Sequence, residues 1–180
     1  MKNIFFISIL GISHVARHVR YLILALCLSS LAQGAKTYLE PADFLAKEAK
    51  GAKAQSITIT SALKRRIEHV NGGRFVPKRV RYWQAGEKTV WILEEIGKTL
   101  PITVGYVVEK GKVLSVQVLI YRESHGYEVS YSYFTKRFRS CYLKENGQLN
   151  KRISNIAGAT LSVRALTKMA RTALLLDAAL

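Results

Sequence analysis

Apolar residues in the middle of the chain follow the two-residue period of β-strands. Segments rich in β-branched and aromatic residues cover 80–84, 89–96, 102–109 and 112–121. A turn at 85–88 separates the first two, and Lys110-Gly111 separates the last two, so both pairs are typical of β-hairpins. Pro101 lies between the hairpins. Four consecutive strands of this kind predict an antiparallel sheet.

The last of these strands differs from the others in its pattern. It alternates between apolar and polar residues from Val113 and then becomes wholly apolar toward Tyr121. A wholly apolar run is typical of a strand that is covered on both faces. We therefore expect 112–121 to be a central strand covered by helices.

A different period, close to that of an α-helix, marks three other segments. Residues 41–50 begin with Pro41, a favoured first residue of helices. Residues 61–70 have one apolar face and are followed by Asn71-Gly72-Gly73, which ends a helix. Residues 160–180 are long enough for a helix of several turns. The chain is therefore expected to be an α+β protein, with N-terminal helices and a long C-terminal helix packed on a twisted antiparallel sheet.

The C-terminal helix is expected to bury one side only. Its apolar stripe comprises Leu161, Leu166, Met169, Ala173 and Leu176. Basic residues lie on the opposite side, at Arg164, Lys168 and Arg171. This arrangement is typical of a helix with one face on the core and one in solvent.

The first 35 residues have the pattern of a secretory signal. Arg17 and Arg20 precede an apolar run at 21–32, which is too short to span a bilayer comfortably. Small residues follow, so we expect cleavage near Gly34 or Ala35 and an exported domain at 36–180, periplasmic or on the outer face of the cytoplasmic membrane. The alternatives are an uncleaved N-terminal anchor or two short membrane-associated segments, since residues 4–12 are also apolar.

Composition excludes several classes of protein. Hydrophobic residues make up 49% of the chain and charged residues 22%, values of an ordinary globular domain and not of a disordered chain. Two cysteines cannot build a disulfide framework, and the domain at 36–180 keeps only Cys141. The four histidines are scattered, so we expect no metal site.

The strongly basic charge favours an anionic partner. The formal charge is +16, and it is +13 after removal of residues 1–35, which hold three basic and no acidic side chains. Such a charge permits a cofactor-free binding module that docks on anionic lipid or on an acidic partner. Export argues against nucleic acid, although the aromatic and basic segment 131–142 has a suitable composition for it.

Candidate chemistry lies where a loop becomes the C-terminal helix. Gly158 permits close approach to the backbone, and Ala159 adds little bulk. The free N–H groups at a helix N-terminus, with the hydroxyls of Thr160 and Ser162, can meet a phosphate. The alternative is a purely structural role, in which Thr160 only caps the helix N-terminus, as Ser and Thr commonly do.

This segment resembles the flavinylation motif of the FMN-binding domain family, Asp-x-x-Ser/Thr-Gly-Ala-Thr/Ser. That family includes the FMN-carrying subunits of sodium-translocating NADH:quinone oxidoreductase and of Rnf-type complexes. The resemblance spans roughly residues 80–175 and points to a small, exported, stand-alone branch. It is carried by segments 81–83, 89–98, 101–105, 121–124, 126–129 and 158–166.

The resemblance implies an FMN that a flavin transferase joins through its phosphate to Thr160. It also implies that Glu123 and Ser124, which match the family's Glu-Thr-x-Gly element, contact the ring or the ribityl chain; otherwise they form a polar turn. The motif's Asp falls on Ser154, and its Ser/Thr falls on Ala157. Either attachment tolerates these changes, or FMN is held without a covalent bond, or the flavin has been lost.

Several aromatic residues are candidates to stack on an isoalloxazine ring. We favour Tyr127 and Phe134 because they lie close to Glu123 in sequence, and we expect the other aromatic side chains to pack in the core or on the surface. His125, inside the Glu-Ser-His-Gly element, is a further candidate for contact with the flavin.

The function that this reading favours is electron transfer by an exported flavoprotein. A membrane-bound or periplasmic redox partner would exchange electrons with the FMN. We expect no catalytic residues of its own, so the chain is interpreted as a redox carrier and not as a self-sufficient enzyme. A small exported reductase is the remaining alternative.

Overall fold

A computed structural model describes residues 34–73, 75 and 77–180. The expected signal segment therefore lies outside the described residues, apart from the two candidate cleavage residues, Gly34 and Ala35. None of the helices in the described ranges combines the length and the apolar character needed to cross a membrane.

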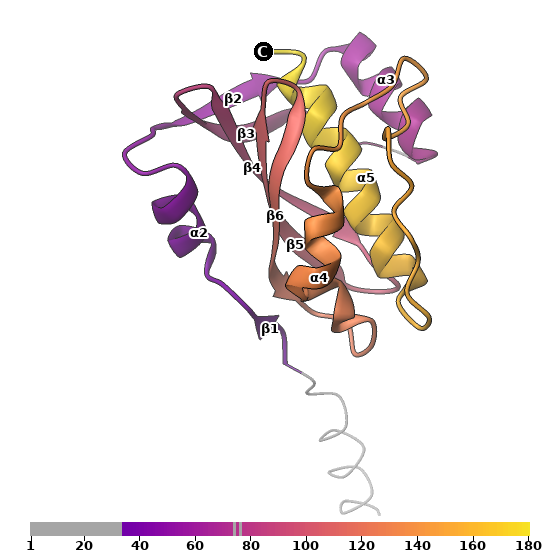
Figure 1. Cartoon of the computed structure of the whole chain (residues 1–180). Coiled ribbons are helices and arrows are strands. Elements are labelled where there is room, and N and C mark those ends of the chain that lie inside the picture. Colours follow the sequence, from indigo (N-terminus) through magenta and orange to yellow (C-terminus); the bar gives the residue numbers. More distant parts are fainter. Residues whose placement is uncertain (1–33, 74, 76) are drawn as a thin grey trace, which may run out of the picture. The chain divides into compact units, whose positions relative to one another are not determined.

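One antiparallel sheet forms the centre of the domain (Figure 1). The four expected strands are confirmed as β3 (Arg79–Ala85), β4 (Lys88–Ile96), β5 (Pro101–Glu109) and β6 (Lys112–Tyr121). The second hairpin turns at Lys110 and Gly111, whose φ angles of 51° and 69° match the right-handed twist of the two strands. Glycine at the second position avoids the cost of that conformation.

Two short strands at the sheet edges were not predicted. β1 (Lys36–Thr37) pairs with the end of β6, and β2 (Ala54–Thr58) pairs with β3, giving the order β1-β6-β5-β4-β3-β2. Only Ile57 of β2 is partly buried, and the rest of that strand is exposed. An edge strand of this kind shows no clear alternation of apolar and polar residues, so its sequence does not reveal it.

The expectation that 112–121 is a central strand is wrong in part. β5 and β4 are central in the sheet, and β6 has only the two residues of β1 on its outer side. Loops cover the rest of that edge: Tyr38 N–H donates to Leu119 O, and Ser140 N–H donates to Val113 O. These loop contacts, and not a neighbouring long strand, explain why an apolar sequence is tolerated there.

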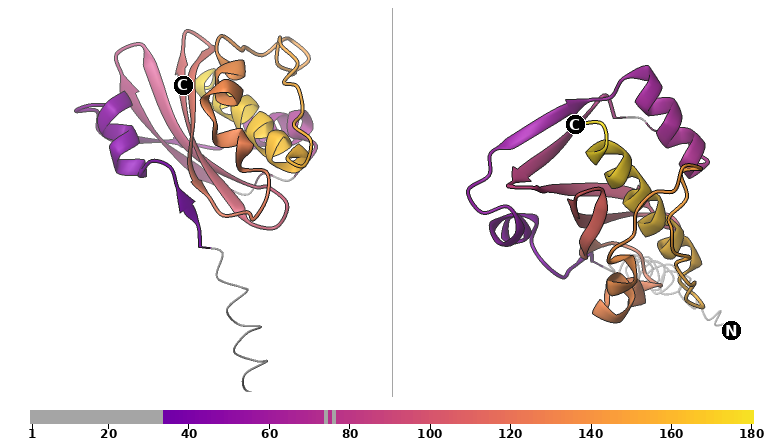
Figure 2. Two further views of the ribbon diagram at one scale, coloured as in Figure 1. Left: turned by 60° about the horizontal axis from the view of Figure 1, so that its bottom comes forward. Right: turned by 45° about the horizontal axis from the view of Figure 1, so that its top comes forward.

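Helices cover both faces of the sheet (Figure 2). α2 (Pro41–Glu48) packs Phe44 on one face, whereas α3 (Ser61–Asn71) and α5 (Thr160–Asp177) lie on the other. α3 begins at an N-cap, Thr60, whose hydroxyl accepts from Leu63 N–H, and ends at Gly72 with a φ of 62°. The α+β fold is confirmed.

The segment between β6 and α5 contains only short helices. η1 (Tyr127–Ser130), α4 (Ser132–Thr135) and η2 (Lys136–Phe138) follow one another along the edge of the sheet. Phe134 and Phe138 are fully buried, and their rings meet edge to face at 5.7 Å. Their packing fixes this segment against the same face that α5 covers.

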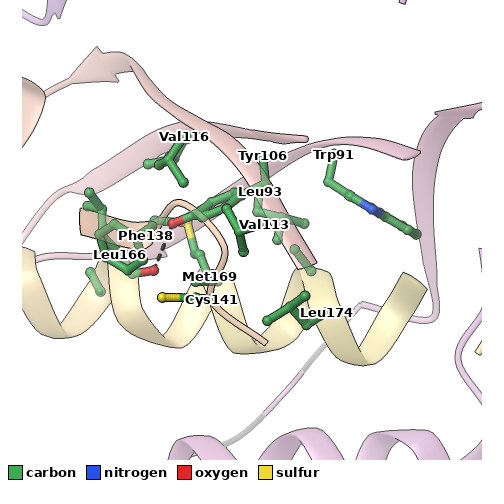
Figure 3. Close-up of a cluster of buried hydrophobic side chains, with 14 of the residues drawn as sticks. Trp91, Leu93, Tyr106, Val113, Val116, Phe138, Cys141, Leu166, Met169 and Leu174 are labelled. Atoms are coloured by element: carbon green, nitrogen blue, oxygen red, sulfur yellow. Dashed lines mark hydrogen bonds between the residues drawn. The ribbon is translucent and has the colours of Figure 1, made fainter. Parts of the chain in front are cut away.

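The main core lies between the sheet and α5 (Figure 3). Trp91, Tyr106 and Leu166 are fully buried there, and the Tyr106 hydroxyl donates to Leu166 O at 2.7 Å. That hydrogen bond satisfies the one polar group of a buried ring, and burial raises the pKa of the Tyr106 hydroxyl well above its usual range.

The burial of three side chains of α5 differs from what its sequence pattern predicts. Leu161 was assigned to the apolar stripe, but its side chain is 42% exposed. Lys168 and Arg171 were placed on a solvated side, but both are partly buried. Lys168 approaches Glu95 to 3.8 Å, and Arg171 donates to Val70 O, because α3 packs on that side of α5.

Candidate functional site

The first turn of α5 is tied to the end of β6 by Tyr121. The Tyr121 hydroxyl donates to His125 O at 2.5 Å and lies 2.8 Å from Ser162 Oγ. Its single proton goes to the carbonyl, so the Ser162 hydroxyl donates to Tyr121. Burial raises the pKa of Tyr121, which keeps this hydroxyl protonated. One side chain thus holds the loop after β6 against the helix.

Gly126 permits the close contact between this loop and α5. Its φ is 87°, and a Cβ at this position would lie 2.9 Å from both Ser162 Oγ and the Tyr121 hydroxyl, and 3.2 Å from Ala159 Cα. No other residue fits there without a shift of its neighbours. The structure therefore brings the Glu-Ser-His-Gly element and the Gly-Ala-Thr segment together.

Thr160 is the first residue of α5, but it does not cap the helix. Ala159 occupies the N-cap position and offers no side-chain hydrogen bond. The alternative that Thr160 is an ordinary cap is therefore wrong. The Thr160 hydroxyl instead accepts a hydrogen bond of 2.7 Å from Asn155 Nδ2. Within the described residues, the first N–H groups of α5 thus have no side-chain acceptor, as an anion site requires.

Gly158 leaves open space in front of the helix. Its φ is 80°, and nothing lies within 4 Å of the position that a Cβ would occupy. Gly158 is exposed, whereas Ala159 and Ser162 are buried. An anion can therefore approach the backbone over Gly158, with Thr160 partly exposed beside it.

Glu123 holds the turn between β4 and β5. Its Oε1 accepts from the N–H groups of Lys98, Thr99 and Leu100, and its Oε2 accepts from the Thr99 hydroxyl at 3.1 Å. Partial burial opposes ionisation of this carboxyl, but the hydrogen bonds outweigh it, so the pKa of Glu123 is lowered. The sequence did not predict these four contacts.

The glycine that begins this turn lies against the same carboxylate. A Cβ on Gly97 would lie 2.9 Å from Glu123 Oε1 and 3.0 Å from the Ile102 side chain. The turn and the loop after β6 therefore form one unit next to α5. Glu123 is half-buried within it, and the proposal that it contacts a flavin stays a prediction.

The other residues of the loop are open to solvent. Ser124 and His125 are exposed, and their side chains are joined by a hydrogen bond of 2.8 Å between Oγ and Nδ1. Tyr127 is 43% exposed, with Lys36 Nζ 5.8 Å from its ring centroid. Phe134, the other residue favoured for stacking, is fully buried in the core and cannot reach a surface ligand.

Exposed apolar side chains gather around this end of the domain. In the described ranges, eight large hydrophobic residues are exposed. Six of them lie at the turn between β4 and β5, in the segment from the loop after β6 to α4, or in the first turn of α5: Ile96, Leu100, Tyr127, Tyr131, Tyr133 and Leu161. Sequence reasoning missed Ile96 and Leu100 and took Leu161 for core. Their only sequence signal is their position next to the turn and the motif.

The segment from Val129 to Leu176 is strongly basic. It contains nine lysines and arginines and one acid, Glu145. Arg137 lies over the rings of Tyr133 and Phe134, at 5.9 and 5.4 Å, and donates to Ser154 O. Arg137 thus places a positive charge beside the segment that leads into α5, which favours an anion there.

Comparison with known families bears on the class of this site. Residues 97–175 match the family model of the FMN-binding domain. The match supports assignment of this part of the chain to the FMN-binding domain family. The match begins at Gly97 and contains the Glu123–Tyr127 loop, the 151–157 segment and most of α5. No curated protein matches the chain.

The FMN-binding domain indicates FMN as the cofactor, and the residues present fit it. The uncapped first turn of α5, the open space at Gly158 and the charge of Arg137 beside the preceding segment suit a phosphate. The exposed apolar residues nearby suit a flat aromatic ring. In the described ranges, no cluster of His, Cys, Asp or Glu side chains suits a metal ion.

A further cavity lies elsewhere in the fold. It has a volume of about 910 Å³ and opens where β3 and β4 part, since these strands pair only from Tyr82↔Trp91 to Ala85↔Lys88. Apolar residues of both sheet faces line it, among them Trp83, Leu93 and Met169. It does not include Thr160 or the loop after β6.

Proposed function

We propose that this protein is an exported electron carrier whose FMN is attached through its phosphate to Thr160. The observation that carries the proposal is the place of Thr160 in an FMN-binding domain: a partly exposed hydroxyl on the uncapped first turn of α5. The match to the family's Gly-Ala-Thr motif also supports Thr160 as the residue of attachment.

The phosphate end of the cofactor would be held by this chain's backbone. The N–H groups of the first turn of α5 point out of the helix, and no side chain in the part of the chain that the structure describes accepts from them. A phosphodiester on Thr160 would carry one negative charge at the positive end of the helix dipole. The Ser162 hydroxyl is already bonded to Tyr121, so its part is to hold the loop in place.

The ring end would lie on the exposed apolar side chains around Thr160. Leu100, Tyr127 and Leu161 are each between 42% and 44% exposed, and a bound ring would remove them from water. FMN supplies reversible electron transfer when it is bound. Nearby cations favour the anionic reduced flavin and so raise its reduction potential.

A ring on this surface is reachable by another protein, which supports a carrier. Electrons would arrive from and leave to a membrane-bound or periplasmic redox partner, and a flavin transferase would be needed for maturation. The apolar run at 21–32 supports export to the periplasm or to the outer face of the cytoplasmic membrane. The basic charge also permits contact with an anionic membrane surface.

The test is to express the full chain with a flavin transferase in an exporting host. Purified protein is denatured in acid and separated by electrophoresis, and flavin fluorescence is read on the denatured band. We expect fluorescence for the unmodified sequence and for Thr160→Ser, and none for Thr160→Ala. Thr167→Ala is the matched control, because Thr167 lies in the same helix but bonds only to Val163 O.

Two results would contradict the proposal in different ways. A colourless denatured band with FMN released from the native protein would mean that the flavin is held without a covalent bond. Absence of flavin from the native protein as well would favour the second candidate, a cofactor-free basic binding module, which the excess of nine bases over one acid between Val129 and Leu176 supports.

A further inference from the structure

Asn155 is the only side chain in the described ranges with a hydrogen bond to the Thr160 hydroxyl. It lies in the segment that leads into α5 and is exposed. A turn brings it back to the helix: Ala159 N–H donates to Ile156 O at 3.0 Å, and Gly158 takes a positive φ. Asn155 Nδ2 then lies 2.7 Å from Thr160 Oγ1.

This hydrogen bond limits the directions in which Thr160 can react. A threonine hydroxyl has two lone pairs and one proton. The Asn155 amide occupies one lone pair, so the other lone pair and the proton stay available for an incoming group. The amide is neutral, so it orients the oxygen without repelling an approaching phosphate.

The same segment is anchored on its other side. Arg137 Nη1 donates to the backbone carbonyl of Ser154 at 3.3 Å. Ser154 stands where the family motif has Asp, and its neighbour Asn155 is the residue that reaches the threonine. Asn155, which bonds to Thr160, thus lies one residue after the position of the Asp in the family motif.

We propose that Asn155 is a positioning residue that orients the Thr160 hydroxyl for attachment of FMN. This inference rests on the proposed function. A phosphate monoester has no good leaving group, so the flavin must come from a dinucleotide in which a pyrophosphate bond joins FMN to a nucleoside monophosphate. A flavin transferase would bind that dinucleotide and catalyse the transfer.

The step conserves atoms and moves no electrons between oxidation states. Thr160 Oγ1 forms a bond to the phosphorus of the FMN half, and the P–O bond to the other phosphate breaks. The nucleoside monophosphate leaves with the bridging oxygen. The threonine proton passes to a base of the transferase. Asn155 keeps its own protons and only holds Oγ1 toward the phosphorus.

The experiment measures the rate of flavin attachment to the full chain with purified transferase and flavin adenine dinucleotide. We expect Asn155→Ala to lower kcat by about three- to tenfold, the effect of one lost hydrogen bond, with the KM for the protein unchanged. Asn155→Gln keeps an amide donor and is expected to recover part of the rate. Asn146→Ala is the matched control, since Asn146 bonds only within its own turn.

Asn155→Asp tests whether the side chain at this position must donate a hydrogen bond to Thr160. A carboxylate cannot donate to Oγ1 and would repel the incoming phosphates, so we expect it to be at least as slow as Asn155→Ala. Full rate in Asn155→Asp would overturn the donor role. Asn155 is exposed, so all these variants are expected to keep the circular dichroism spectrum and melting temperature of the parent.

The outcomes separate this inference from the proposed function. If the parent protein does not receive a flavin, or if Thr160→Ala still receives one, the proposed function and the inference about Asn155 both fail. If the parent is modified at Thr160 and Asn155→Ala reacts at the parental rate, only the inference about Asn155 fails. A raised KM with unchanged kcat would also overturn it, because that pattern indicates recognition by the transferase and not orientation of the hydroxyl.

Discussion

At the scale of single residues, one carboxylate organises the loops beside the candidate site. Glu123 accepts hydrogen bonds from three consecutive backbone N–H groups and from the Thr99 hydroxyl. The sequence predicted that Glu123 contacts the flavin. In the structure, the hydrogen-bond partners of its carboxylate are groups of the chain itself. Its first effect is to fix the turn between β4 and β5.

Replacing that carboxylate is expected to make stability less dependent on pH. The pKa of Glu123 is lowered in the folded protein, so its ionised form contributes stability above its ordinary pKa, and this is lost as the pH falls through the folded pKa. Glu123→Gln should lose about 1–2 kcal/mol of unfolding free energy at neutral pH and little in acid. Urea unfolding at both pH values measures this.

The exposed Glu145→Gln is the control for that comparison and should change little at either pH. An equal loss for Glu123→Gln at neutral pH and in acid would contradict a role for the ionised carboxylate.

Two glycines with similar backbone angles are expected to respond differently to alanine. Gly126 and Gly158 have φ angles of 87° and 80°, but only Gly126 has atoms within 3 Å of a Cβ. Gly158→Ala should cost about 1 kcal/mol from the backbone alone, and Gly126→Ala about 2–4 kcal/mol. Thermal unfolding of both variants measures the difference, and equal costs would mean that the loop moves freely from α5.

At the scale of elements, Phe44 is the buried side chain by which α2 packs on the sheet. Phe44 is fully buried and lies against Gly105 of β5, where a Cβ would approach the ring to 2.4 Å. Gly105 is paired on both sides, with Ile92 and Gln117, so the backbone cannot shift without loss of ladder hydrogen bonds. The missing side chain thus makes room for the helix.

The pair of Phe44 and Gly105 is suited to a double-mutant cycle. Gly105→Ala alone should destabilise the protein by about 1–3 kcal/mol through overpacking, and Phe44→Ala alone by about 3–5 kcal/mol. In the double variant the clash is absent, so its cost should fall clearly below the sum. Denaturant unfolding of the four proteins measures this, and additive costs would contradict direct packing of Phe44 on Gly105.

At the scale of the whole molecule, binding to an anionic surface and retention of the flavin are expected to respond differently to salt. The chain carries a formal charge of +16, and the C-terminal basic segment holds much of it. Attraction to an anionic surface weakens as the Debye length falls from about 10 Å at 0.1 M salt to about 3 Å at 1 M. A flavin joined through a covalent bond is not held by that attraction.

We therefore expect flavin content per protein to stay constant from low to high salt, while co-sedimentation with vesicles containing phosphatidylglycerol falls steeply. Vesicles of phosphatidylcholine alone are the control. Flavin lost in parallel with vesicle binding would contradict covalent attachment. Vesicle binding that resists salt would contradict a contact made by charge alone.

Much of the fold was predictable because its signals are local. Both hairpins and the helices at 41–48, 61–71 and 160–177 follow from short-range patterns and from turn residues such as Gly72 and Lys110-Gly111. The edge strands were not predicted, because β1 has two residues and β2 buries only part of one side chain. The exposure of Leu161 also depends on what packs beside it.

The sequence by itself determined the elements, the placement of Thr160 at the start of a helix and the resemblance to the FMN-binding domain. Periodicity, turn chemistry and a motif are properties of neighbouring residues, so they can be read along the chain. The tertiary structure decided the order of the strands, the contact of Glu123 with the turn before β5 and the hydrogen bond from Asn155 to Thr160. Each depends on how the backbone folds back on itself, and no local pattern encodes that.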